Sequence, residues 1–141
     1  MFRKTLLSLV VGAGIVSNLG AESLKTDMNI LATSLASVQR GFLLNDRDKT
    51  VKLLADLKTH VYHVLGNEKK VVALLPEKLK YKSRIAVNSG KMIRTYIDEI
   101  EGIYYDKTLT PIKAQMEAQS ALVNIQVQCY KCHNLVRDWK N

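Results

Sequence analysis

Two cysteines and a histidine lie close together near the end of the sequence. Cys129 and Cys132 are three residues apart, and His133 directly follows the second cysteine. Residues three apart on a helix share a face, so two such thiols can add across the two vinyl groups of one porphyrin. The imidazole of the next residue then lies near the iron. The spacing C-x-x-C-H therefore predicts one covalently attached haem c, with His133 as the proximal iron ligand.

Two other chemistries use cysteines at this spacing. A thioredoxin-like pair would follow a strand in a βαβ unit, and no alternating strand pattern precedes Cys129. A zinc site could combine Cys129 and Cys132 with His60 and His63, which stand three apart and would share a helix face. That ligand set leaves His133 without a role, so haem attachment is favoured over zinc.

The first residues are typical of a secretory signal. A short basic start at residues 2–4 is followed by an apolar stretch, and the first acidic residue is Glu22. This order predicts a signal peptide at 1–21, cleaved near Ala21, and a mature domain at 22–141 in the periplasm. An uncleaved anchor is disfavoured, because the apolar stretch falls short of the ~20 residues of a spanning helix. Export would take the thiols to the compartment where haem is attached.

The chain is basic, with 21 Lys and Arg against 13 Asp and Glu among 141 residues. The charges are spread along the sequence, and no nucleic-acid recognition motif accompanies them. The excess positive charge therefore indicates solvated helix faces and attraction toward acidic partners, not nucleic-acid binding. The length suits a single domain.

Apolar residues recur at helical spacing in four segments, and glycine and proline are scarce after the signal. The first segment ends near Asn45, which suits a helix C-terminus, and Asp46 suits the N-cap of the next helix. The second segment stops near Gly66. Pro76 interrupts the stretch that follows, which we expect to form a connection or a short helix before the third segment.

The last segment begins with Thr110 as the expected N-cap and Pro111 at the first helical position. Its apolar positions are separated by steps of three and four residues, which places both cysteines on the face toward the core. The simplest architecture is all-α, an antiparallel four-helix bundle with haem attached near the C-terminus of helix four. These apolar positions are Ala118, Leu122, Ile125, Cys129, Cys132, Val136 and Trp139.

In length, helix number and motif position, the chain resembles the cytochrome c′ family, which are exported four-helix-bundle cytochromes with one haem. The similarity is sharpest in CYKCHNLVR, where an arginine follows the haem histidine by four places. The resemblance implies that Arg137 lies beside His133 on the proximal side of the haem. Family members often form homodimers through helix one, so the resemblance also implies a homodimer for this chain. The basic connection around Pro76 departs from the glycine-rich loops of many members.

The family takes its distal residue from the first half of helix one, so the resemblance points to Met28, between Leu24 and Leu31, as the distal iron ligand. A methionine on an apolar stripe is also ordinary core filler. His60 and His63 are rival ligands if the second helix faces the haem.

The expected function is one-electron transfer with a redox partner protein, or binding of a small gas such as nitric oxide, and not enzymatic catalysis. A methionine ligand would make the iron six-coordinate and favour electron transfer, whereas a blocking leucine would favour gas binding. The alternative is a haem-containing, ligand-sensing helical module. A peroxidase is disfavoured, because no distal acid–base set is visible beyond the two histidines of the second helix.

Overall fold

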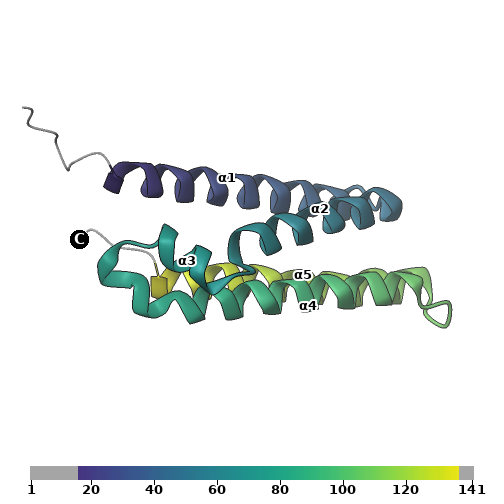
Figure 1. Ribbon diagram of the computed structural model, residues 1–141. Coiled ribbons are helices and arrows are strands. Elements are labelled where there is room, and N and C mark those ends of the chain that lie inside the picture. Colours follow the sequence, from purple (N-terminus) through teal and green to yellow (C-terminus); the bar gives the residue numbers. More distant parts are fainter. Residues whose placement is uncertain (1–15, 137–141) are drawn as a thin grey trace, which may run out of the picture.

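The structure, a computed structural model, describes the backbone of residues 16–136 and the side chains from Ser23 onward, except that of Leu135. The described chain is entirely helical, and four long helices match the four predicted segments (Figure 1). The elements are α1 (Val16–Leu43), α2 (Arg47–Leu65), α3 (Glu68–Leu74), the 3-10 helix η1 (Glu77–Lys82), α4 (Ser83–Tyr105) and α5 (Pro111–Val136). None of these helices combines the length and apolarity that a membrane span requires.

The helix boundaries follow the predicted capping residues. Asn45 adopts a left-handed backbone conformation, with φ of 52°, after the end of α1. The Asp46 side chain then accepts a hydrogen bond of 3.0 Å from the backbone N–H of Lys49, which caps α2. Thr110 caps α5 in the same way, accepting from the N–H of Lys113 at 3.3 Å. Each cap satisfies a backbone donor that the first helical turn leaves unpaired.

The stretch between α2 and α4 forms two short helices. Asn67 caps α3 by accepting a hydrogen bond of 3.2 Å from the N–H of Lys70. Pro76 lies between α3 and η1, at the point where the predicted interruption falls. The short helices pack against α4 and bring Val71, Leu75 and Leu79 into the interior.

Consecutive long helices run in opposite directions and lie alongside one another (Figure 1). The close pairs are α1 with α2, α2 with α4, and α4 with α5. Over the described residues, α1 and α5 scarcely approach each other at the level of the backbone. The side chains of all four long helices therefore have to fill the space between α1 and α5.

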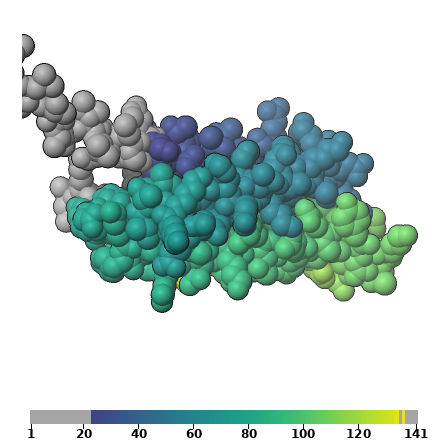
Figure 2. All heavy atoms as spheres, viewed as in Figure 1, coloured from purple at the N-terminus to yellow at the C-terminus, as the bar shows by residue number. Residues whose placement is uncertain are grey.

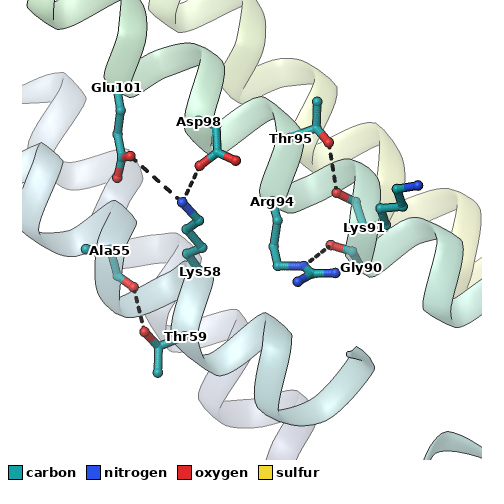
Figure 3. Close-up of polar contacts among 9 residues, drawn as sticks. All are labelled: Ala55, Lys58, Thr59, Gly90, Lys91, Arg94, Thr95, Asp98 and Glu101. Atoms are coloured by element: carbon teal, nitrogen blue, oxygen red, sulfur yellow. Dashed lines mark hydrogen bonds and ion pairs between the residues drawn. The ribbon is translucent and has the colours of Figure 1, made fainter. Parts of the chain in front are cut away.

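On the outer side of the contact between α2 and α4, polar side chains pair across the helices (Figure 3). The ammonium group of Lys58 on α2 is bonded to Asp98 and lies 4.0 Å from Glu101, both on α4. Arg94 places its guanidinium carbon 5.2 Å from the ring centroid of Tyr62. Because these groups are largely exposed, each pair contributes ~1 kcal/mol or less to stability.

At the end of the molecule away from the cysteines, Tyr104 links three helices. Its hydroxyl donates to Oε1 of Gln115 at 2.9 Å, and Nε2 of Gln115 donates to the carbonyl of Phe42 at 3.3 Å. The Arg47 guanidinium lies 5.2 Å from the tyrosine ring centroid. Burial raises the pKa of Tyr104 to about 12, because the charged phenolate is disfavoured there.

Replacing Tyr104 by Phe removes the hydroxyl bond, and we expect the free energy of unfolding at neutral pH to fall by about 1 kcal/mol. The raised pKa also makes the native chain lose stability as pH rises from the ordinary tyrosine value of 10.0 through about 12, because the folded state retains a proton that the unfolded state releases. Urea unfolding of both proteins across this range tests the effect. Identical pH dependence in the native chain and the variant would contradict it.

Two glycines of α4 form a matched pair for testing the packing. A Cβ atom at Gly90 would lie 2.5 Å from Cβ of Leu65 on α2, whereas a Cβ at Gly102 would meet nothing within 4 Å. Gly90→Ala is therefore expected to destabilise the protein by roughly 1–3 kcal/mol. Gly102→Ala should stabilise it by up to ~1 kcal/mol, since alanine is the better helix former. Urea unfolding that shifts both variants in the same direction would refute the close approach of α2 and α4.

Candidate functional site

The last turns of α5 carry the sequence-predicted cysteines toward the interior. Cys132 is only 9% exposed and belongs to an apolar cluster with Val64, Leu65 and Val136. Cys129 is half-buried and packs against the neighbouring cluster of the core. Both residues are free thiols. The predicted core-facing stripe of the last helix is thus confirmed for its described residues.

A cavity of about 140 Å³ lies beside the two thiols, among all four long helices. Its lining is almost entirely apolar, and the side chains come from α1, α2, α4 and α5. Ser89 and Gln128 are the polar residues of this lining besides the cysteines and His133. A space of this character is the usual setting of a bound organic group. The residues that line it are Met28, Leu31, Ala32, Leu35, Leu57, Val61, Leu65, Ser89, Ile93, Ile125, Gln128, Cys129, Cys132 and His133.

A second cavity, of about 450 Å³, adjoins the first toward α3 and η1. Four residues line both: Met28, Leu65, Cys132 and His133. The second cavity adds Val71 and other apolar residues of the short helices, while Lys25 and Asn29 supply polar groups from α1. In the view of Figure 2, the surface of α2, α3, η1 and α4 lies in front, and α5 is almost entirely hidden behind it.

The cavity beside the thiols is partly open to solvent and is not an enclosed void. Protein interiors normally retain few voids larger than a water molecule. Water gains few hydrogen bonds from an apolar lining of this kind. The lining is therefore suited to contact with an apolar group.

Burial governs the acid–base state of the thiols. It raises the pKa of Cys129, and it raises that of Cys132 to about 11. Both sulfurs are therefore protonated at neutral pH. A redox-active or catalytic cysteine instead needs a lowered pKa, which favours the thiolate. This environment argues against the thioredoxin-like use of the pair.

His133 and Met28 border the same space from different helices. The His133 side chain is exposed on α5, at the rim of both cavities. Met28 is half-buried on α1 and also lines both. The residues that flank Met28 on its stripe divide between the cavities, with Leu31 at the first and Leu24 at the second. The expected proximal and distal candidates thus both line each of the two cavities.

The two histidines of α2 lie elsewhere. Nδ1 of His60 is 2.8 Å from the hydroxyl of Ser34 on α1, and His63 is exposed. Neither lines either cavity. Among the residues that the structure describes, no group of three or more His, Cys, Asp and Glu side chains is placed to hold a metal ion. The zinc set of Cys129, Cys132 and these histidines is therefore not assembled.

The sequence predictions and the structure differ at several residues of the site. Arg137, expected beside His133, lies outside the described residues, as does most of the expected signal peptide at 1–21. Sequence reasoning did not identify Ser89 or Leu65. The small residues Ser89 and Gly90 between apolar positions of the third segment were a usable signal, because small side chains mark close helix contacts.

Comparisons with protein-family models, with curated proteins and with solved structures found no match for this chain.

Proposed function

We propose that this protein is a monohaem c-type cytochrome of the cytochrome c′ type. Its four long helices would form an antiparallel bundle around the haem, with α3 and η1 as a side cover. The observation that carries this proposal is the position of the C-x-x-C-H motif. Both thiols line a largely apolar cavity, and that cavity is shared with Met28 of α1.

The residues present fit a covalently attached haem. Cys129 and Cys132 stand one helical turn apart beside the cavity, as attachment to two neighbouring vinyl groups requires. Each S–H would add across one vinyl double bond, with the sulfur bonded to one carbon and the hydrogen to the other, so attachment would need neither oxidant nor reductant. The apolar side chains of α1, α2 and α4 would pack on the porphyrin faces and exclude water.

The remaining roles fall to side chains at the cavity. His133 would provide the proximal nitrogen, after its imidazole turns inward from the rim. Met28 would provide the distal sulfur and raise the reduction potential, as a methionine ligand does in other cytochromes. The bound group supplies one-electron exchange or a binding site for a small gas such as nitric oxide. The protein's part is to set ligation, burial and access.

The setting proposed for this chemistry is the periplasm, reached through the signal at 1–21. Without Arg3 and Lys4 of the signal, 19 Lys and Arg remain against 13 Asp and Glu, and this formal charge of +6 would speed encounter with an acidic redox partner protein. The alternative function, a ligand-sensing helical module, would use the same apolar space for a small molecule.

Expression with an export and haem-attachment system tests the proposal. We expect c-type absorption bands, a pyridine haemochrome spectrum and an intact mass that exceeds the apoprotein by one haem. The double variant Cys129→Ser, Cys132→Ser should lose the covalent haem, while His63→Ala, exposed on α2, should retain it. A purified native chain that contains zinc and no haem would overturn the proposal. A colourless chain with a small apolar molecule would support the sensor alternative.

Replacing Met28 tests the distal assignment. Met28→Ala is expected to convert a low-spin ferrous spectrum to high spin, because the sulfur ligand is lost. Met28→Leu preserves most of the side-chain volume without the sulfur, so it should give the same spectral change with less effect on stability. Ile30→Ala, on the outer side of α1, is the control and should leave the spectrum unchanged. If Met28→Leu keeps the native spectrum, Met28 is a packing residue and not a ligand. That result would favour gas binding over electron transfer.

A further inference from the structure

The helix that carries the cysteines has a second apolar face. Five large side chains on its outer side are exposed, by fractions between 49% and 76%. They lie opposite the core-facing stripe, within about 40° of one line along the helix at 3.6 residues per turn. We call them the outer stripe: Ile112, Met116, Val123, Val127 and Tyr130.

A helix of a monomeric protein normally has one apolar face and one polar face. The outer stripe instead runs for about 27 Å at 1.5 Å per residue, about two thirds of the length of the 26-residue α5. Exposed Gln119 and Ser120 lie on the same side between Met116 and Val123, so the stripe consists of two apolar segments. Large apolar side chains gathered on one exposed helix face in this way mark an interaction site.

The charge pattern limits what can cover this stripe. No charged residue occurs from Ala118 through Tyr130, between Glu117 and Lys131, although the chain has a net charge of +8. A strongly charged partner would find no complementary group along the middle of the stripe. A second copy of the same helix would bury no charge there, and its positive charges elsewhere would remain in water.

The spacing of the outer stripe suits pairing with itself. A two-fold axis through the region of Ala121 and Leu122 would place Ile112 opposite Tyr130 of the partner subunit. The same axis would place Met116 opposite Val127 of the partner subunit. A two-fold interface requires this kind of self-complementarity.

We propose that two copies of this protein associate through an antiparallel contact between their α5 outer stripes. The stripe offers on the order of 400–500 Å² of apolar surface per copy, so the dimer would bury about 800–1,000 Å² in total, below the ~1,200 Å² of stable specific interfaces and in the range of weak, transient ones. The dimer is therefore reversible and depends on protein concentration. It differs from the helix-one dimer that the family resemblance suggests, and it does not depend on the haem assignment.

Sedimentation equilibrium of the purified full chain over about a thousandfold concentration range tests this contact. The native chain should convert from monomer to dimer. Val123→Lys and Val123→Glu should each raise the dimer dissociation constant at least about tenfold, because each puts two like charges within about one helical turn of each other across the axis. An equimolar mixture of the two variants should dimerise again, which a folding defect would not produce.

Matched controls separate this contact from other associations. Leu43→Glu changes an 86%-exposed apolar residue at the end of α1 and should leave the dissociation constant unchanged. A native chain that stays monomeric over the whole range would overturn the proposal. So would dimerisation that is lost in Ile30→Glu on α1 and preserved in Val123→Lys. Binding to vesicles of neutral lipid, with no dimer in solution, would assign the outer stripe to a membrane surface instead.

Discussion

The central constraint in this molecule is the separation of α1 from α5. The pairs α1–α2, α2–α4 and α4–α5 pack closely, while α1 and α5 leave apolar space between them at the cysteine end. Closely packed helices leave little such space, so this end of the molecule differs from an ordinary closely packed core. The thiols, His133 and Met28 all border this space. The fold thus leaves apolar space at the place where the proposed haem would be held.

The two ends of the molecule differ in how their helices are connected. Away from the cysteines, the hydroxyl of Tyr104 and the amide of Gln115 connect α4, α5 and the end of α1 through buried hydrogen bonds around a filled core. At the cysteine end, short helices replace such links and leave room. Gly90 permits α4 to approach Leu65, which lines both cavities. These hydrogen bonds can therefore hold the helices in register at the far end, while the apolar space lies at the near end.

Much of the fold could be predicted from the sequence, because the capping residues, the proline and the apolar spacing all indicate the same helices. Asp46 and Thr110 cap helices where predicted, and Pro76 separates two short helices. The cysteine stripe was predictable from its spacing alone. The cavity was not, since its volume depends on how far α1 stands from α5, which no residue pattern encodes. The spacing that suggested zinc for His60 also carried no information on Ser34, which takes up Nδ1 of that ring. The outer stripe of α5 is a second series of apolar residues at helical spacing. It could have been predicted from the sequence, but only the core-facing series was.

The most direct test of the central claim is mass spectrometry of the peptide that spans Cys129 to His133, after extraction of the exported protein with acidified organic solvent. Thioether bonds survive this extraction, whereas a haem held only by ligation and packing does not. We expect this peptide to retain one porphyrin, bonded to both cysteines. A colourless peptide whose two cysteines both react with an alkylating reagent would contradict it.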